Sequence, residues 1–164
     1  MRIRELQRHE WALFRELRLR ALAESPDSFA RRFADEQAQP DAHWMRLTES
    51  VTIPGGQVML VAEEDGRPLG LAFGLFDKER PKIGHVGGMW VDPAARGLGA
   101  GQALLDAAIA WARGRELESL ELWVTEGNGA ALRLYERLGF ADTGRRDMLP
   151  SNPVLQTIQM ALNL

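Results

Sequence analysis

The sequence predicts a single α/β (α+β) domain over residues 1–164, with a mixed, mostly antiparallel sheet of about six to seven strands flanked by helices. Segments with the two-residue alternation of strands are interspersed with segments of helical period. Several neighbouring strand-like segments are separated by short turns, which favours antiparallel hairpins. With 164 residues, 45% of them hydrophobic, the chain is large enough to bury one core. These observations together indicate a mixed sheet covered by helices.

The amino-terminal third is predicted to be one short strand followed by three helices. Residues 1–6 alternate apolar and charged side chains, and residues 9–24 place apolar side chains at helical spacing. Ser25 is a preferred N-cap residue and Pro26 suits the first helical position, so we expect a second helix to begin there. Pro40 opens the third helix. The large apolar residues of the last two helices are Phe29, Phe33, Trp44, Met45 and Leu47.

The middle of the chain is predicted to form three consecutive strands, over residues 57–63, 68–76 and 82–91. The first two are joined at residues 65–66 by Asp-Gly, a dipeptide typical of two-residue hairpin turns. The third contains a glycine pair at residues 87–88. Such a pair inside a strand marks a bulge or a close approach of another group to the backbone. We therefore expect a ligand to approach this strand.

The carboxyl-terminal part is predicted as helix, strand, helix and two closing strands. The first helix covers residues 98–113, and residues 120–125 alternate as a strand. The second helix covers residues 128–139, because Asn is a good N-cap residue and Gly ends a helix in the left-handed conformation. The closing strands cover residues 140–148 and 154–162, with a proline-containing turn between them.

Composition excludes several functional classes. The net charge of −3 gives no basic face for nucleic acid, and the absence of cysteine excludes disulfides and a cysteine nucleophile. The histidines His9, His43 and His85 lie far apart in a pattern that predicts no metal site. There is no apolar run of membrane-spanning length and no signal-like beginning, so we expect a cytoplasmic protein that contacts no membrane. We expect a monomer or a homodimer.

A glycine-rich turn between a strand and a helix is the strongest functional signal. Pro93 ends the strand, and residues 96–102 read Arg-Gly-Leu-Gly-Ala-Gly-Gln. The first amides of a helix lack carbonyl partners and carry partial positive charge, so this turn can hold an anion with Arg96 at its rim. The spacing does not match the dinucleotide fingerprint, which would need a third glycine at Gln102, and no P-loop sequence is present.

Two sequence blocks resemble the GCN5-related N-acetyltransferase (GNAT) family. Arg96-x-x-Gly99-x-Gly101 matches the R/Q-x-x-G-x-G/A motif of that family. The second block is Asn128-x-x-Ala131-x-x-x-Tyr135-x-x-x-Gly139-Phe140. An opening segment at residues 17–29 also resembles one bacterial subset, so the resemblance covers nearly the whole chain. It implies a GNAT-like fold and acetyl-CoA as co-substrate, without a metal.

The resemblance also implies roles for individual residues. In the family, the loop amides hold the pyrophosphate of acetyl-CoA and the bulged strand runs beside the pantetheine arm, where the Val91 amide would meet the thioester oxygen. Asn128 would bond to the amide groups of the cofactor, and Tyr135 would protonate the departing sulfur. The cofactor-binding residues so implied are Met89, Trp90, Val91, Arg96, Gly97, Leu98, Gly99, Ala100, Gly101, Gln102, Asn128, Ala131 and Tyr135.

The general base is left open among three residues. An alkylammonium with a pKa of about 10 must lose a proton before it attacks, and a carboxylate or a histidine can accept that proton. Glu36, His85 and Glu126 are the candidates, each of which is more commonly a solvated or hydrogen-bonded polar group. An acceptor pocket could be lined by aromatic residues that more commonly form the core, namely Phe29, Phe33, Trp44, Trp90 and Trp123.

The predicted function is that of an acetyl-CoA-dependent N-acetyltransferase. Transfer occurs by direct attack of a primary amine in a ternary complex, which agrees with the lack of a cysteine nucleophile. We favour a small-molecule amine over a protein amino group, because no long acidic run suggests a groove for a basic peptide. The alternatives are a non-catalytic acyl-CoA-binding module or sensor, and an acyltransferase that uses a larger acyl-CoA.

Overall fold

Seven strands form one sheet in the computed structural model, which describes residues 1–164. Their spatial order is β1-β2-β3-β4-β5-β7-β6, and all neighbours are antiparallel except the parallel pair β4 and β5. This confirms the predicted mixed, mostly antiparallel sheet. The strands are β1 (Arg2–Glu5), β2 (Val58–Glu64), β3 (Arg67–Phe76), β4 (Ile83–Val91), β5 (Ser119–Thr125), β6 (Ala141–Leu149) and β7 (Asn152–Asn163).

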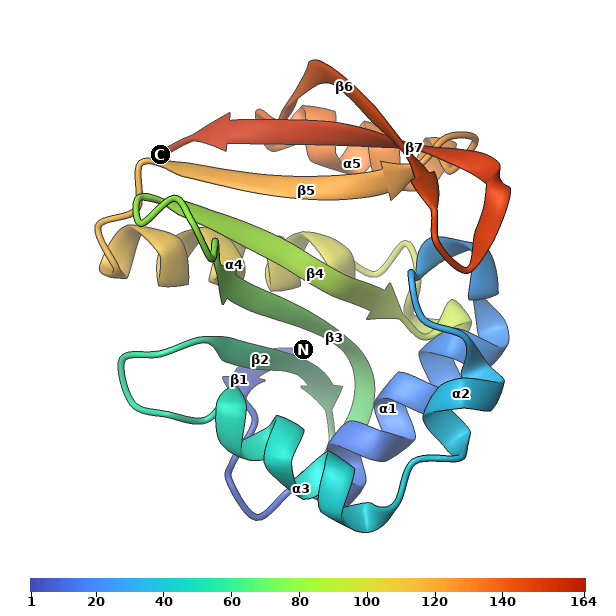
Figure 1. The fold of residues 1–164 in the computed structure, drawn as a ribbon. Helices are drawn as coiled ribbons and strands as arrows, with labels where there is room; N and C mark the ends of the chain where they lie inside the picture. Colours follow the sequence, from blue (N-terminus) through green and yellow to red (C-terminus); the bar gives the residue numbers. More distant parts are fainter.

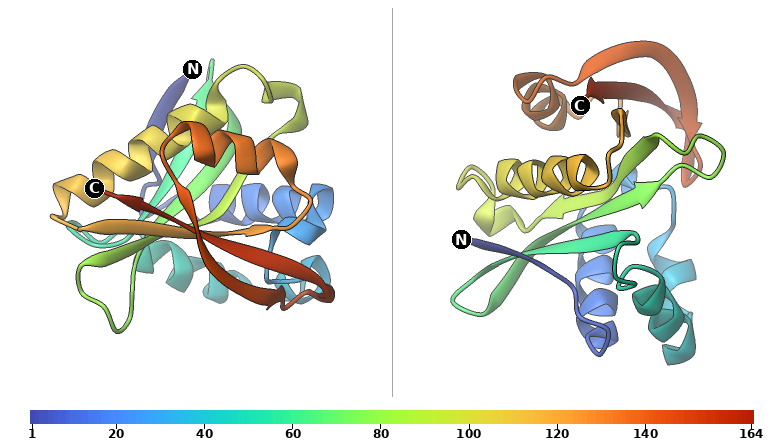
Figure 2. Two further views of the ribbon diagram at one scale, coloured as in Figure 1. Left: turned by 90° about the horizontal axis from the view of Figure 1, so that it is seen from above. Right: turned by 90° about the vertical axis from the view of Figure 1, so that its left-hand side faces the viewer.

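Helices cover both faces of this sheet. α1, α2 and α3 lie on one face, whereas α4 and α5 lie on the other (Figures 1 and 2). None of them combines the length and the apolar character that crossing a bilayer requires. The helices are α1 (Trp11–Glu24), α2 (Phe33–Gln37), α3 (Asp41–Ser50), α4 (Ala100–Gly114) and α5 (Gly129–Arg137), with short 3₁₀ turns η1 (Pro26–Ser28) and η2 (Pro93–Ala95).

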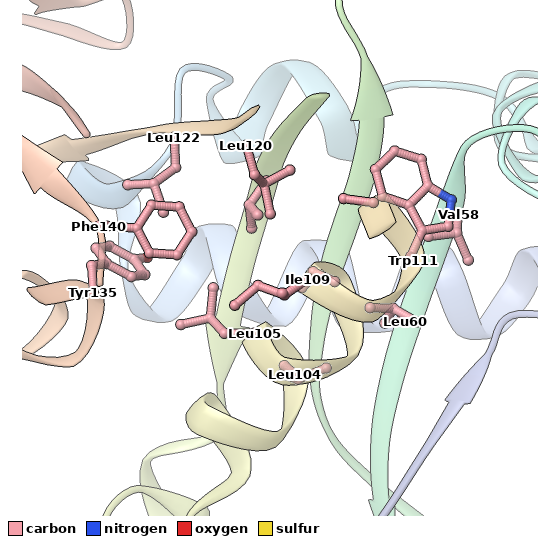
Figure 3. Close-up of a cluster of buried hydrophobic side chains, with 14 of the residues drawn as sticks. Val58, Leu60, Leu104, Leu105, Ile109, Trp111, Leu120, Leu122, Tyr135 and Phe140 are labelled. Carbon is pink, nitrogen blue, oxygen red and sulfur yellow. The ribbon is translucent and has the colours of Figure 1, made fainter. Parts of the chain in front are cut away.

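Each face of the sheet has its own apolar core. On the α4 face, Leu104 and Leu105 are fully buried against the sheet, and Tyr135 and Phe140 lie at one end of the same cluster (Figure 3). On the other face, α1 and α3 pack around Trp44, which is also fully buried. The two cores fix the sheet between the helices, and the sheet in turn fixes the strand ends that form the site.

The prediction of a helix beginning at Ser25 is wrong. The Ser25 side chain caps no backbone amide, because its hydroxyl donates to the Glu24 carboxylate instead. Only the 3₁₀ turn η1 follows, and Phe29 then adopts an extended conformation that directs the chain toward the core, where Phe29 is buried. Helix α2 begins only at Phe33.

The adjacent strands β4 and β5 separate soon after they meet. They pair only from Ile83 to His85 on β4 and from Ser119 to Glu121 on β5, and beyond these residues they diverge (Figure 1). The predicted irregularity in β4 is confirmed at Gly88, which has a φ of +55°. There β4 contains one more residue than the facing part of β3, as expected of a bulge.

Candidate active site

A cleft of about 1350 Å³ lies where β4 and β5 diverge. Its walls come from the end of α1 and η1, the bulged half of β4, the loop before α4, the end of β5, α5 and the turn between β6 and β7. Pockets for one small ligand usually measure about 300–1000 Å³. The cleft therefore has room for a large cofactor together with a second molecule.

The glycine-rich turn forms one wall of the cleft. Gly97 and Gly99 have φ values of +77° and +87°, a region that favours glycine, and Gly99 is the N-cap residue of α4. A Cβ at either position would have no neighbour within 4 Å, so space is open on that side of the backbone. At Gly101 a Cβ would lie only 3.1 Å from Leu134, so this glycine lets α4 pack closely on α5. The turn thus has the backbone geometry of an anion cradle.

The predicted loop residues do not all face the cleft. Arg96, Gly97, Gly99, Gly101 and Gln102 line it. The side chain of Leu98 is 65% exposed and that of Ala100 is buried, and neither lines the cleft. Only backbone groups of these two residues are therefore candidates for ligand contacts.

Arg96 is held by protein groups at the edge of the cleft. Its Nε donates to the Val91 carbonyl at 3.0 Å, and its Nη2 pairs with the Glu24 carboxylate. Glu24 also accepts a hydrogen bond from the Trp90 indole at 2.9 Å. Burial tends to raise the pKa of Glu24, but the hydrogen bonds from Arg96, Ser25 and Trp90 outweigh it and lower the pKa to about 2. Glu24 thus ties the end of α1 to both β4 and the glycine-rich turn.

This depressed pKa predicts an acid-sensitive link. Because the folded-state pKa of Glu24 is about 2 and its ordinary value is 4.5, its contribution to stability is present above pH 4.5 and is lost as the pH falls toward 2. Its side chain is about one third exposed, so the contribution is modest. We expect Glu24→Gln to lower the melting temperature at pH 7 by roughly 2–4 °C. Thermal melts from pH 7 to pH 3 should show this difference shrinking, and a constant difference would contradict the link.

Tyr135 lies on α5, where it lines the cleft and closes one end of the core (Figure 3). Its hydroxyl has one protein partner, the Met89 sulfur at 3.8 Å, and its ring packs against Phe140. Burial raises the pKa of Tyr135 to about 12. The phenol therefore stays protonated at neutral pH and can donate a proton.

Asn128 begins α5 as predicted. Its side-chain oxygen accepts a hydrogen bond from the Ala131 amide at 3.3 Å, and Gly139, with a φ of +94°, follows the end of the helix. Asn128 and Ala131 both line the cleft. The cap is confirmed, and the cap residue lies where it can also contact a ligand.

His85 lines the cleft at the point where β4 and β5 begin to separate. Its Nε2 lies 2.7 Å from the Asp77 carboxylate, and its Nδ1 lies 4.0 Å from Glu121. Arg80 bonds to both of these carboxylates. Its guanidinium and the His85 ring hold the pKa of Asp77 well below the usual range. The imidazole is thus fixed in orientation by a network of charged groups.

The other two candidate bases lie in different environments. Glu126 is exposed and lines the cleft. Glu36 is buried, lies 3.8 Å from the His43 ring and does not line the cleft. Among the predicted aromatic lining residues, Phe29, Trp90 and Trp123 line the cleft, whereas Phe33 and Trp44 do not.

The family follows from a comparison with known families. The family model described as "Acetyltransferase (GNAT) family" matches residues 7–140. The chain belongs to the GNAT acetyltransferase family. This match spans the cleft strands, the glycine-rich turn and Tyr135.

Curated relatives and solved structures agree with this assignment. A mycothiol acetyltransferase of Salinispora tropica is 37% identical over 129 residues, which cover 76% of this chain and 39% of the relative. A GNAT-family acetyltransferase structure from Streptococcus pneumoniae superposes with a TM-score of 0.83 at 22% identity, covering 99% of both chains. A putative acetyltransferase from Salmonella typhimurium, solved with acetyl-CoA, gives a TM-score of 0.82 at 22% identity and covers 100% of this chain and 94% of its own.

The chain spans about two fifths of the length of the curated mycothiol acetyltransferases that it matches. The solved structures, by contrast, match over nearly their whole length and share the GNAT fold with this chain.

Three side chains of the site were not singled out from the sequence. Arg18 and Glu24 lie on α1, which reaches the cleft only through its packing on the sheet, and Asp77 lies in the turn after β3. No motif in the sequence links these residues to the glycine-rich turn or to His85. The GNAT resemblance at residues 17–29 was the one signal that pointed to this region.

Proposed function

We propose that this chain is an acetyl-CoA-dependent N-acetyltransferase that moves an acetyl group to a primary amine by direct attack in a ternary complex. One observation carries the proposal: a glycine-rich turn with open space beside its backbone and a buried tyrosine whose pKa is raised to about 12 line the same cleft. Membership of the GNAT family supports it, as does the likeness in fold to a protein solved with acetyl-CoA.

The cofactor is proposed to lie along the glycine-rich turn and β4. The amides of residues 97–102 would hold the pyrophosphate, since the open space beside Gly97 and Gly99 lets a ligand approach the backbone. Met89, Trp90 and Val91 would flank the pantetheine arm, with Asn128 and Ala131 opposite them across the cleft. Because Arg96 already pairs with Glu24, the amides rather than its side chain would provide most of the anion binding.

The proposed reaction has one transfer step with two proton movements. The amine nitrogen forms a bond to the thioester carbonyl carbon, and the carbon–sulfur bond breaks. The Val91 amide would stabilise the oxyanion, an interaction of roughly 3 kcal/mol in enzymes of this kind. Tyr135 donates its proton to the departing sulfur, and a base accepts the proton that the amine loses. A tyrosine with a pKa of about 12 is a proton donor throughout the neutral range.

His85 is the base that the geometry favours. With the Nε2 hydrogen donated to Asp77, Nδ1 carries the free electron pair and can accept a proton. Asp77 and Glu121 flank the ring and hold it in this orientation. The Glu126 side chain has no hydrogen-bond partners that fix its orientation, and Glu36 does not line the cleft.

A His85→Gln variant tests this assignment. We expect kcat/KM at pH 7 to fall by roughly 10²-fold, the lower end of the usual range for acid–base catalysis, because an amine with a pKa of about 10 is almost entirely protonated at pH 7. The loss should shrink as the pH approaches the amine pKa of about 10. Glu126→Gln is the matched comparison and should lose less activity. A pH-independent loss for His85→Gln, or a larger loss for Glu126→Gln, would contradict the role of His85 as base.

The acceptor is proposed to be a small-molecule amine rather than a protein amino group. The support is the absence of an acidic run that would suit a basic peptide. The Salinispora tropica relative is named a mycothiol acetyltransferase, but the match covers only 39% of that protein, so we do not propose the same acceptor for this chain.

The activity is tested by following thiol release from acetyl-CoA with a panel of amines. We expect turnover with at least one amine and acetylation of its nitrogen by mass spectrometry. If the chain bound CoA but released no thiol with any amine, the proposed enzymatic activity would be wrong and the chain would be a binding module. A faster reaction with a longer acyl-CoA would overturn the choice of acetyl donor.

A further inference from the structure

We propose that Arg18 binds a carboxylate on the amine acceptor, so that the acceptor is an amino acid or another amine bearing a carboxylate. This inference rests on the proposed function and names its substrate class. It begins with an arginine that the fold leaves without a partner. Arg18 lies on α1, and its side chain lines the cleft beside Phe29.

The Arg18 guanidinium makes no hydrogen bond to the protein. Its Nη1 is buried and has no partner, and no carboxylate lies within 4.0 Å of the group. The carbon of the guanidinium lies 5.1 Å from the centre of the Phe29 ring, an arrangement that fixes its plane while leaving its N–H groups unused. Burial lowers the pKa of Arg18, and Glu36 only partly opposes this effect. The protein alone therefore does not satisfy this cation.

Arg20 and Arg96 differ from Arg18 in this respect. Arg20, on the same helix, pairs with Asp92, and Arg96, at the cleft edge, pairs with Glu24. Burying a cation without a counter-charge is unfavourable, whereas a bidentate carboxylate provides both charge and hydrogen bonds. A ligand anion in the cleft would supply the missing partner.

The position of Arg18 relative to the bulge limits the size of the acceptor. The Arg18 Nη1 lies 3.2 Å from where a Cβ would stand on Gly88. The absence of a side chain at Gly88 leaves this space for the Phe73 ring, which lies 2.6 Å from the same point, and for the guanidinium. Because Met89, Trp90 and Val91 follow directly, a carboxylate at Arg18 would place a nearby amine toward the proposed acetyl group. A short separation between amine and carboxylate, as in amino acids, fits this arrangement.

The charges around the cleft favour a carboxylate over a phosphate. The charged residues that line the cleft include Arg18, Arg96 and Arg137 and the acidic residues Glu24, Asp27, Glu126 and Asp147, so carboxylates outnumber guanidinium groups there. A monoanion would balance the guanidinium of Arg18, which is buried without a protein partner, whereas a dianion would add repulsion from the acidic residues. The acceptor anion is therefore assigned as a carboxylate.

Matched acceptors test the inference. Thiol release is measured for a set of amino acids, each compared with its decarboxylated amine and with the aminophosphonate of the same skeleton. We expect at least one amino acid to exceed both analogues in kcat/KM by about 30-fold, near the lower end of the effects seen when one partner of a buried ion pair is removed. Arg18→Gln should abolish this preference by lowering kcat/KM for the amino acid toward that of its decarboxylated amine. Arg18→Lys should restore part of it.

Arg15→Gln is the matched control. Arg15 lies one turn earlier on α1 and also has a buried nitrogen without a partner, but it does not line the cleft. The Arg15→Gln variant should therefore keep the preference for the amino acid over its two analogues. Calorimetric titration of the amino acid into the CoA-bound chain gives a readout besides activity, and Arg18→Gln should lose that binding. Because Arg18 makes no hydrogen bond or ion pair with the protein and only stacks on the Phe29 ring, its replacement should lower the melting temperature only slightly.

The outcomes separate this inference from the proposed function. Equal rates with carboxylate-bearing and decarboxylated amines would overturn the role of Arg18 and leave the acetyltransferase intact. A preference for the aminophosphonate would overturn the assignment to a carboxylate. If an amino acid bound in a manner that depends on Arg18 but was not acetylated, the carboxylate-binding role of Arg18 would stand and the proposed acetyltransferase activity would be wrong.

Discussion

Replacement of Tyr135 by Phe is expected to lower kcat by roughly 10²- to 10⁴-fold, the usual contribution of a positioned acid, with little change in CoA affinity. The variant removes only the hydroxyl that we propose protonates the departing sulfur. The phenol has a pKa of about 12, so it is available as a proton donor over the whole range in which the enzyme is assayed. The loss should therefore be similar at pH 7 and pH 9.

The structure makes this variant a clean test. The hydroxyl has one protein partner, the Met89 sulfur at 3.8 Å, which is a weak hydrogen bond, so its loss should hardly affect stability. Phe140→Leu is the control, because it alters the packing of the Tyr135 ring and leaves its hydroxyl in place. That variant should lose stability but keep most of its kcat. Unchanged kcat in Tyr135→Phe would remove Tyr135 from the mechanism.

The double replacement Gly97→Ala with Gly99→Ala is expected to weaken CoA binding by roughly 100-fold. Both residues have positive φ values, and an L-residue in this region is disfavoured by roughly 1–2 kcal/mol. Two such effects correspond to about two factors of ten in a dissociation constant. Because neither Cβ would meet an atom within 4 Å, nothing holds the substituted turn in its present shape. It should relax and misplace the amides that hold the pyrophosphate.

Calorimetric titration with CoA measures this effect, and Gly114→Ala is the matched control. Gly114 ends the same helix, has no positive φ, and a Cβ there would also have open space. Its replacement should leave CoA affinity unchanged. If the double variant bound CoA as tightly as the parent chain, the turn would not be the anion cradle.

Local signals in the sequence were sufficient to predict much of the fold. The Asp-Gly turn at residues 65–66 joins β2 and β3, the glycine pair marks the bulge in β4, and Asn128 caps α5. Each of these features depends on residues that are neighbours in the chain. Ser25 shows the limit of such reasoning. The Ser25 hydroxyl donates to the Glu24 carboxylate instead of capping a helix, because Glu24, Ser25 and Arg96 meet at the edge of the cleft.

The candidate site likewise has features that short motifs predict and features that depend on contacts between distant residues. The glycine-rich turn, Asn128 and Tyr135 occupy short motifs, so their shared place at one cleft could be expected from the family resemblance. The hydrogen-bond and ion-pair partners of these residues could not be predicted from the sequence. Glu24 reaches Arg96 across 72 residues, and Glu121 reaches Arg80 across 41 residues. These contacts arise from the packing of α1 on the sheet and from the pairing of β4 with β5, which no local pattern encodes.

The crystal structure of the chain with bound CoA is the most direct test of the central claim. We predict that the pyrophosphate will lie on the amides of residues 97–102, with the pantetheine arm between β4 and β5. The sulfur should lie within hydrogen-bond reach of the Tyr135 hydroxyl and near the Val91 amide. A pyrophosphate bound away from the glycine-rich turn, or a sulfur remote from Tyr135, would contradict the proposed acetyl-transfer site.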